Sequence, residues 1–354
     1  MAALALAGAA AFAAHCRRSD GQDCGDTAVH PPPPRRRHTG HLPEQNRLVL
    51  GREPPRAAIM TAPTVLAITL NWRQAETTLA CVRALQAMAY PNLSILVIDN
   101  GSGDGSAARL ADELPPEARL RALPENVGFA AGNNVGLREA IAQEFDFALL
   151  VNNDAFAAPD MLARLLAETA PDVGLVSPKI FYAAERERIW FGDGRMHPIT
   201  LDLRGTGRGQ MDGPDWRHSR DADYVLGTCL LVNLRGVTAV GLLDEQFFMY
   251  FEDLDWSLRW RQAGFRLRLA ADAHLYHEVA LSSGGLESAA RRYYLARSGV
   301  IFWRRYARLG RPWAIFLFRL GSGVKMVARL LLRGETAVAR AYLRGLRDGW
   351  RASA

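Results

Sequence analysis

The sequence predicts an α/β protein in which helices cover both faces of a mostly parallel sheet, a three-layer α/β/α sandwich. From Thr64 onward, short apolar runs alternate with amphipathic segments, the pattern of parallel strands joined by helices. Polar residues follow directly after several of these runs. Apolar residues fill 49% of the 354 positions, which supports a sizeable core and excludes a mostly disordered or fibrous protein.

The clearest predicted elements lie in the first part of this pattern. In order, we expect a strand over 65–70, a helix over 76–88, a strand over 94–98 and a strand over 147–151. Asp104 and Ser106 are candidate N-terminal caps of a helix that follows the second strand. Pro159 suits the first turn of a helix after the last of these strands.

Polar side chains follow two of the predicted strands at the point where each ends. Asp99 follows the second strand, and Asn152, Asn153 and Asp154 follow the strand over 147–151. Ligands of open α/β sheets bind at the carboxyl ends of the strands. Asp99 and Asp154 therefore lie where a nucleotide is expected.

The next part of the chain ends in a cluster of acids. Residues 183–223 are rich in Gly, Arg and Asp and weakly periodic, so we expect a long excursion there, followed by a strand over 224–232. The apolar run 247–251 then leads into a helix that ends near Gly264. The macrodipole alone favours acids in its first turn, but the bulky apolar run before them indicates the rim of a buried surface. These acids are Glu252, Asp253 and Asp255.

The net charge of +6 hides a strong asymmetry. Residues 291–354 carry 15 Lys and Arg against 2 Asp and Glu, whereas 61–290 carry 20 against 30. We therefore predict a disordered leader over 1–60, an α/β domain over 61–290 and a basic amphipathic helical tail over 291–354. The cysteines lack the spacing of a zinc site or a disulfide framework, which favours a reducing compartment. They are Cys16, Cys24, Cys81 and Cys229.

The leader contains an Ala/Leu-rich start, prolines at 31–34 and arginines at 35–37, without a helix or strand period. A signal peptide is the alternative, but the start lacks the positively charged region of such peptides and a cleavage context near Cys16. Met60 stands just before the first strand and is a candidate natural start. In that case the leader is not part of the working protein.

The basic tail mixes aromatic and aliphatic residues with arginines. Its longest run without charge, 312–318, is seven residues, far short of the ~20 that span a bilayer. Basic side chains beside apolar ones suit helices that lie on an anionic membrane surface. The alternative is an amphipathic helical pair packed on the α/β domain. A pI near 9.4 also suggests a nucleic-acid binder, which predicts steep salt dependence and no metal requirement.

Several motifs occur in one order between Thr64 and Arg305. They are DNGS at 99–102, NVGFAAGNNVG at 126–136, NND at 152–154, GTC at 227–229, the run 243–256 and His277. Each motif alone is weak evidence. Together they resemble the family 2 glycosyltransferases, and within that family the rhamnosyltransferase-like branch.

The resemblance implies a GT-A-like fold and assigns Asp99 to recognition of a pyrimidine base. The alternative for Asp99 is a simple turn. The stretch 126–136 holds three glycines and three asparagines, which allow a close backbone approach and supply amide groups. It has neither the Gly-Lys-Ser/Thr of a P-loop nor the dinucleotide fingerprint. The residues expected at the nucleotide sugar are Asp99, Asn100, Asn126, Gly128, Asn133 and Asn153.

The resemblance also implies a divalent metal, Mg²⁺ or Mn²⁺. The 152–154 motif matches the family's Asp-x-Asp position with Asn152 in place of the first aspartate, and Asp154 remains as an anchor beside the donor's phosphates. Asn152 and Asn153 are equally expected as caps of the strand end. A lone histidine is usually a core or loop residue, but the family places a metal ligand at the position of His277. His274 is the second candidate.

Asp253 is the predicted general base of an inverting transfer, which requires it across the sugar from the metal. Glu252 is expected to orient this base or to bind the donor sugar. Asp255 and Trp256 are expected to support the acceptor side, over which the excursion 183–223 would also run. Two adjacent buried acids raise the pKa of one of them, and the sequence leaves open which acid that is.

The predicted function is therefore transfer of a sugar, first of all rhamnose from dTDP-rhamnose, to a cell-surface glycan on a polyprenyl carrier. A galactofuranosyl- or other hexosyltransferase that uses a UDP-sugar is the alternative within this class. A non-catalytic, membrane-docked subunit that binds a nucleotide sugar is the alternative outside it. The expected location is the cytoplasm, peripheral at the inner face of the cell membrane, with no nucleic-acid partner.

Overall fold

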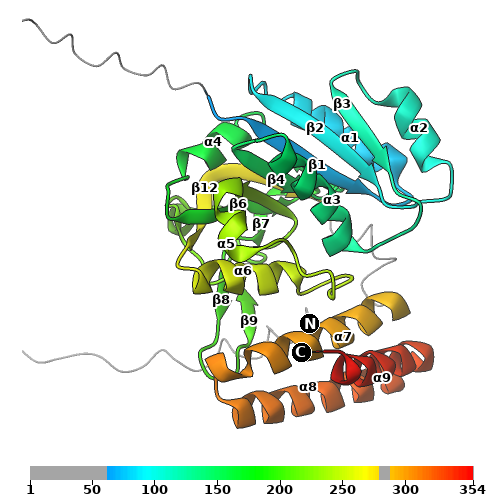
Figure 1. Cartoon of the computed structure of the whole chain (residues 1–354). Coiled ribbons are helices and arrows are strands. Elements are labelled where there is room, and N and C mark those ends of the chain that lie inside the picture. The colour runs from blue at the N-terminus through cyan, green and yellow to red at the C-terminus, as the bar shows by residue number, and fades with distance from the viewer. Residues whose placement is uncertain (1–61, 279–287, 354) are drawn as a thin grey trace, which may run out of the picture. The chain divides into compact units, whose positions relative to one another are not determined.

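A computed structural model describes residues 62–278 and 288–353 of the chain (Figure 1). The chain divides into two units, and all of these residues belong to the second, Ile59–Ala354. The leader predicted over 1–60, with its candidate start at Met60, lies outside the described residues.

Four parallel strands form the first half of the main sheet, in the order β3-β2-β1-β4. These strands are β1 (Val65–Asn71), β2 (Leu93–Asp99), β3 (Ala118–Ala122) and β4 (Phe147–Val151). The helices between them are α1 (Ala75–Gln86), α2 (Ser106–Glu113) and α3 (Phe129–Ala142).

The second half of the sheet is mixed. Strand β11 (Cys229–Asn233) runs antiparallel between β4 and β6 (Val173–Tyr182), and β12 (Arg266–His277) runs parallel to β6. Three short strands join this half, namely β5 (Ala155–Ala157), β7 (Glu185–Phe191) and β10 (Arg220–Asp221). A separate hairpin consists of β8 (Gly194–Met196) and β9 (Leu203–Gly205). The helices here are α4 (Met161–Ala167), α5 (Leu234–Val240) and α6 (Glu252–Gln262).

The sheet confirms the predicted α/β class, and the differences lie at element ends. The first strands match the prediction within a residue or two. Pro159 precedes α4 by two residues, so it is not in the helix's first turn. The excursion 183–223 contains short strands rather than one irregular loop. The strand predicted over 224–232 begins only at Cys229, because the residues before it turn toward α6, where Gly227 binds Asp253.

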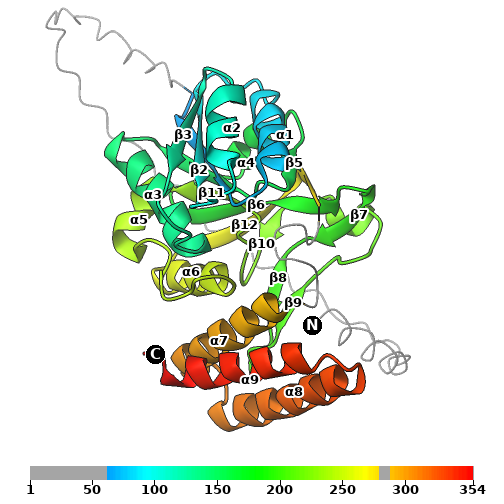
Figure 2. The same cartoon turned by 90° about the vertical axis from the view of Figure 1, so that its right-hand side faces the viewer.

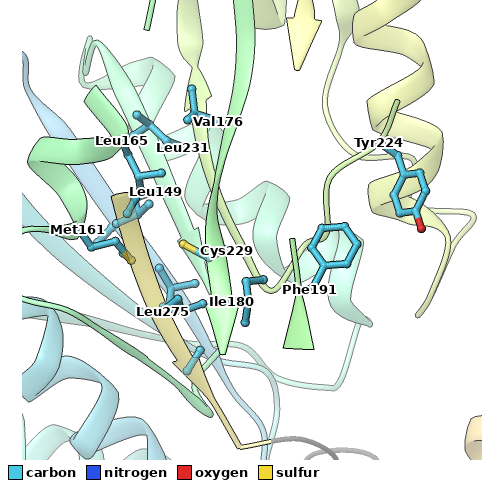
Figure 3. Packing of buried hydrophobic residues seen from close by; sticks show 14 of the residues in the cluster. Leu149, Met161, Leu165, Val176, Ile180, Phe191, Tyr224, Cys229, Leu231 and Leu275 are labelled. Carbon is cyan, nitrogen blue, oxygen red and sulfur yellow. The ribbon is translucent and has the colours of Figure 1, made fainter. Parts of the chain in front are cut away.

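Side chains that alternate along each strand build two apolar layers, one on each face of the sheet. Val65 and Ala67 of β1 belong to the layer under α1, while Leu66 and Ile68 belong to the layer under α3. Figure 3 shows the first layer where Leu149 of β4, Val176 of β6 and Leu275 of β12 meet Met161 and Leu165 of α4. Strands buried on both faces explain the nearly continuous apolar runs of the sequence.

Three C-terminal helices follow the sheet, α7 (Ala289–Tyr306), α8 (Pro312–Leu332) and α9 (Thr336–Arg351). They form a layer beside the sheet-bearing part of the unit (Figure 2). Ile301, Phe302 and Tyr306 of α7 are buried in the same core cluster as Val65. The first helix of the predicted tail is therefore part of the core. Among the described helices, none combines the length and apolar character needed to cross a bilayer.

Two glycines of α9 allow that helix to lie directly on α7. A Cβ at Gly345 would overlap the carbonyl oxygen of Tyr293, and one at Gly349 would lie 2.6 Å from the carbonyl oxygen of Arg297. Gly321, in α8, has no atom within 4 Å of the position that a Cβ would take. The close packing of α7 on α9 thus depends on glycine at specific positions.

We predict opposite effects for alanine at two of these glycines. Gly321→Ala should raise the free energy of unfolding by ~0.5–1 kcal/mol, because alanine favours a helix over glycine. Gly345→Ala should lower it by ~1–3 kcal/mol, because α9 must move off α7. Denaturant unfolding of both variants measures the difference. Equal effects would show that α9 does not pack on α7 in this way.

Candidate functional site

The carboxyl ends of β1, β2 and β4 lie at one edge of the sheet. Asn71 at the end of β1 is in register with Asp99 at the end of β2. Strand β4 ends at Val151, and Asn152 to Asp154 follow it directly. Since these strands are parallel neighbours, the polar residues that follow them gather at the same edge, as the sequence predicted.

Asp99 is buried and held in a tight turn. Its carboxylate accepts hydrogen bonds from the Asn71 side-chain amide (2.6 Å), from the Ser102 hydroxyl (2.5 Å) and from the Ser102 backbone N–H (3.1 Å). The two alternatives for Asp99, a turn residue and a ligand contact, are compatible, because each carboxylate oxygen can accept more than one hydrogen bond. Asn71 was not predicted, since only the pairing of β1 with β2 brings it to Asp99, whereas Ser102 belongs to the same DNGS motif as Asp99.

Asn100 fixes the loop that starts α3. Its side chain donates to Asn126 Oδ1 (3.2 Å) and to the Gly128 carbonyl (3.1 Å), and accepts from the Val127 N–H (3.1 Å). Gly128 has φ +90°, and a Cβ there would lie 2.5 Å from the carbonyl oxygen of Phe248. Glycine at 128 therefore lets the start of α3 approach the run that leads into the acids.

The two asparagines inside α3, Asn133 and Asn134, make different hydrogen bonds. Asn133 donates to the carbonyl of Phe129 one turn earlier (2.9 Å), so its amide is engaged within its own helix. Asn134 binds Leu243 in both directions, with its amide on the carbonyl (2.8 Å) and its oxygen on the N–H (3.1 Å), and also donates to Glu245 (2.9 Å). Asn134 thus fastens the segment before the acids to α3, a role that the sequence did not single out.

Asp154 and His277 lie side by side. Strand β5 pairs with β12 so that His277 is opposite Ala155, and His277 Nε2 lies 3.1 Å from Asp154 Oδ1. Both side chains are buried. Asn153 donates to the Thr78 hydroxyl of α1 (3.0 Å), which anchors the segment from behind. His274, the second candidate, packs edge-on against Phe181 instead.

This pair fits two positions in the coordination shell of one divalent cation. Asp154 Oδ1 and His277 Nε2 lie 3.1 Å apart, so the two side chains could both contact one cation, and a carboxylate oxygen and an imidazole nitrogen are suitable donors for it. One carboxylate and one imidazole leave room for phosphate oxygens and water. Within the described ranges no cluster of three or more potential side-chain ligands occurs.

The acids begin α6 after a strained piece of backbone. Tyr250 and Phe251 both adopt positive φ, at 67° and 72°, which costs a non-glycine residue ~1–3 kcal/mol. Asp253 accepts from the N–H groups of Gly227 and Leu254, each at 2.8 Å. Glu252 is buried, and its Oε2 has no hydrogen-bond partner among the described residues. The strained turn thus precedes two adjacent carboxylates, of which Glu252 is buried and Asp253 is partly buried.

Burial changes the acidity of both groups. Burial and the neighbouring charge of Asp253 raise the pKa of Glu252 well above its ordinary value of 4.5. Burial likewise raises the pKa of Asp253, although the two backbone N–H groups oppose this by stabilising its charged form. The sequence predicted that one of the two acids would be raised, and burial affects both.

The segment before β11 contacts both Asp253 and the chain just before Asp154. The N–H of Asn152 donates to the carbonyl of Thr228 (2.9 Å), and the N–H of Gly227 donates to Asp253 (2.8 Å). Two consecutive residues therefore bind Asp253 and the backbone that leads into Asp154. A Cβ at Gly227 would lie 3.2 Å from the ring of Phe129 and 3.4 Å from Cβ of Asp253, so the start of α3 lies at the same place.

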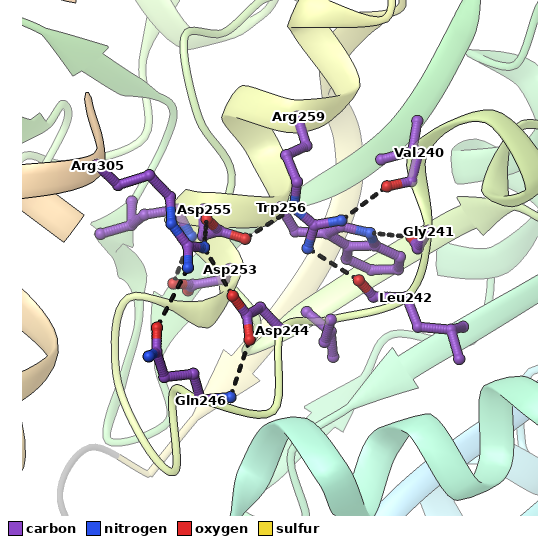
Figure 4. Close-up of polar contacts among 12 residues, drawn as sticks. Val240, Gly241, Leu242, Asp244, Gln246, Asp253, Asp255, Trp256, Arg259 and Arg305 are labelled. Atoms are coloured by element: carbon purple, nitrogen blue, oxygen red, sulfur yellow. Dashed lines mark hydrogen bonds and ion pairs between the residues drawn. The ribbon is translucent and has the colours of Figure 1, made fainter. Parts of the chain in front are cut away.

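Asp255 and Trp256 follow the two acids in α6, and Figure 4 shows their polar contacts. Both are 0% exposed. Asp255 is bound by Arg259 (2.8 Å) and, from α7, by Arg305 (2.7 Å) and the Tyr306 hydroxyl (2.8 Å). The Trp256 ring N–H donates to the carbonyl of Gly241 (2.9 Å). Any support that this pair gives to the acceptor side is therefore indirect, through the position of α6.

The sequence of the chain is similar to those of known glycosyltransferases. A family model described as glycosyltransferase like family 2 matches residues 62–296. An N-acetylglucosaminyl-diphospho-decaprenol L-rhamnosyltransferase of Mycobacterium tuberculosis is 29% identical over 220 residues, 54% of this chain and 68% of that protein. A dTDP-rhamnosyl transferase, RfbF, of Shigella flexneri is 19% identical over 221 residues, 60% of this chain and 72% of that protein.

A solved structure shows a similar fold. The mannosyltransferase PcManGT of Pyrobaculum calidifontis, in complex with GDP-Man and Mn²⁺, aligns with a TM-score of 0.52 and 17% identity, over 83% of this chain and 89% of that chain. This likeness shows the fold alone, a GT-A-like sheet with its helices.

Replacing Glu252 by glutamine should stabilise the protein as pH rises. The folded-state pKa lies above the unfolded one, so wild-type stability falls as pH increases from the ordinary pKa to the folded pKa. Glu252→Gln removes this loss, and its Tm should exceed that of wild type by ~2 °C or more at neutral pH, with no difference near pH 4. Thermal unfolding across this pH range provides the measurement.

Glu245 supplies a matched control of opposite sign. Hydrogen bonds from Asn134 and Arg138 hold the pKa of Glu245 below its ordinary value, so its charge stabilises the folded state above that value. Glu245→Gln should therefore lower Tm at neutral pH and leave it unchanged in acid. If Glu252→Gln also lowers Tm at neutral pH, the charged form of the Glu252 carboxylate does not destabilise the folded state.

Proposed function

The chain belongs to glycosyltransferase family 2, and we propose that it is an inverting, metal-dependent enzyme that transfers rhamnose from dTDP-rhamnose. The observation that supports this most strongly is the joint position of two groups. The N–H of Gly227 donates to Asp253, one of the two adjacent acids of raised pKa. The carbonyl of the next residue, Thr228, accepts from Asn152, which leads into the possible cation-binding pair Asp154 and His277. One group suits a departing diphosphate, and the other suits proton transfer.

Asp253 is the proposed base. Its oxygens are oriented by the N–H groups of Gly227 and Leu254, and burial brings its pKa closer to neutrality. In the transfer, the acceptor hydroxyl oxygen forms a bond to the anomeric carbon, and the bond from that carbon to the diphosphate oxygen breaks. The hydroxyl proton passes to the carboxylate. Glu252, whose Oε2 is unpartnered among the described residues, is the proposed partner that orients the base or binds the donor sugar.

Asp154 and His277 would hold Mg²⁺ or Mn²⁺ together with the donor's phosphates. When bound there, the cation would supply neutralisation of the charge that develops on the nucleoside diphosphate. We propose that Asp99 recognises the pyrimidine base from the neighbouring strand end. The remaining predicted nucleotide residues are engaged with backbone groups, with each other or, for Asn153, with the Thr78 hydroxyl, so we propose that they shape the loops around the nucleotide. They are Asn100, Asn126, Gly128, Asn133 and Asn153.

Two relatives support the choice of sugar and acceptor. Both are named as rhamnosyltransferases, and one name specifies a diphospho-decaprenol acceptor. We therefore propose a glycan on a polyprenyl carrier as the acceptor of this chain. Such a carrier places the reaction at the inner face of the cell membrane, where the basic C-terminal helices would meet an anionic surface.

Donor binding should require the cation pair. A ligand at about a hundred times its Kd adds about 2.7 kcal/mol to the free energy of unfolding, which raises Tm by several degrees. We expect this rise with dTDP-rhamnose and Mn²⁺, a loss of most of it without metal, and none in Asp154→Ala. Asp160→Ala removes an exposed carboxylate nearby in sequence and should behave as wild type. A shift with UDP-sugars in place of dTDP-rhamnose favours another hexosyltransferase.

Transfer itself should depend on Asp253. Asp253→Asn keeps the shape of the side chain but cannot accept the proton, so kcat should fall by ~10²–10⁴-fold while donor binding persists. Asp272→Asn, at an exposed position of β12, is the matched control and should retain full activity. Release of dTDP in the presence of an acceptor measures the rate. Normal turnover by Asp253→Asn would exclude it as the base, and binding without turnover in wild type would favour the non-catalytic subunit.

A further inference from the structure

Helix α8 carries an apolar face that points into solvent. Six large apolar side chains lie on this face, and each is between 52% and 66% exposed. Their spacing of three, four and seven residues places them on one side of the helix. They are Trp313, Phe316, Leu317, Leu320, Val324 and Leu331, and we refer to them as the outer face of α8.

The opposite face of α8 packs against the rest of the protein. Ile315, Met326 and Leu330 are buried there. Arg319 lies on the same inner side, with its guanidinium 3.7 Å from the centre of the Trp303 ring. The fully buried contacts of α8 therefore come from this inner side, while more than half of each side chain of the outer face is exposed. In both views α8 lies on the side of the helical layer away from the sheet (Figures 1 and 2).

The surroundings of the outer face are basic. Helix α8 contains no acid, and Arg311 and Arg333 flank its two ends. Lys325 is exposed between them. On α9, Arg340, Arg344 and Arg347 are exposed as well. An apolar strip rimmed by positive charge matches a layer of lipid tails beneath anionic headgroups.

The basic charge around the outer face of α8 favours a lipid surface over a second copy of this chain as its partner. Two copies that met through the outer face would bring like-charged rims together, which opposes association. Lipid phosphates would neutralise the same charges. We propose that α8 lies in the plane of an anionic membrane and inserts its outer face, led by Trp313 and Phe316, among the acyl chains near the headgroups.

The proposal deepens the proposed function, because a polyprenyl-linked acceptor is presented at such a surface, and it rests on that function for its purpose. Insertion of side chains differs from attraction of a basic tail in one measurable respect. Electrostatic attraction alone disappears in high salt, whereas apolar insertion retains part of the binding. Vesicle binding is measured without any transfer of sugar, so the two proposals can fail separately.

The test is flotation of the full chain with vesicles of phosphatidylcholine and phosphatidylglycerol, at low and high salt. Wild type should float with these vesicles, less with pure phosphatidylcholine, and still in part at high salt. The double variant Phe316→Ser/Leu320→Ser should lower the partition coefficient about tenfold or more. Met211→Ser removes an apolar side chain that is 51% exposed on another surface and should bind as wild type.

Three further measurements complete the test. The double variant should keep the wild-type Tm, since the substituted side chains are exposed, and should transfer sugar normally to a water-soluble acceptor analogue. Equal vesicle binding by the double variant and wild type overturns the proposal, as does wild type that fails to bind. A wild-type dimer in light scattering that becomes a monomer in the double variant also overturns it, in favour of a second copy. Vesicle binding without any transfer contradicts only the proposed function.

Discussion

The buried charge of Asp255 constrains the rest of the site. This carboxylate is 0% exposed, and burying an ion costs several kcal/mol unless opposite charges and hydrogen bonds compensate. Arg259 compensates from the same helix, while Arg305 and the hydroxyl of Tyr306 compensate from α7. Arg305 also binds Asp244. Helix α7 is therefore needed to keep Asp255 buried in the first turn of α6. The neighbouring acids Glu252 and Asp253 depend on α7 for their position in the same way.

The same helix stabilises the strained turn before the acids. The positive φ of Tyr250 and Phe251 is unfavourable by itself. The ring of Phe251 packs against Phe302 and Trp303, with centroids 5.3 and 5.8 Å apart, and the Ser298 hydroxyl donates to the carbonyl of Met249 (2.9 Å). These contacts of α7 offset the strain. Glu252 and Asp253 are thus held in place by packing before any ligand arrives.

Sequence patterns predicted what depends on local spacing. The strand ends at Asp99 and Asp154 and the helix that starts with acids follow from periodicity, and the proximity of His277 to Asp154 agrees with the resemblance. The contact between Asp255 and Arg305 joins residues 50 positions apart, and no spacing rule indicates it. The contacts of α7 with the core are also distant in sequence. The sequence pattern therefore predicts α7 as part of a basic tail, although its apolar side chains are buried in the core.

A continuous path of contacts connects the outer helices to the acids. Arg319 of α8 lies over Trp303, Trp303 packs edge-on against Phe251, and Phe251 directly precedes Glu252. Burial lowers the pKa of Arg319 to about 10, which still leaves it charged at neutral pH, where it stays attracted to the ring. A closely packed interior transmits displacement rather than absorbing it. A continuous series of packed side chains therefore joins α8 to the turn that precedes the two carboxylates.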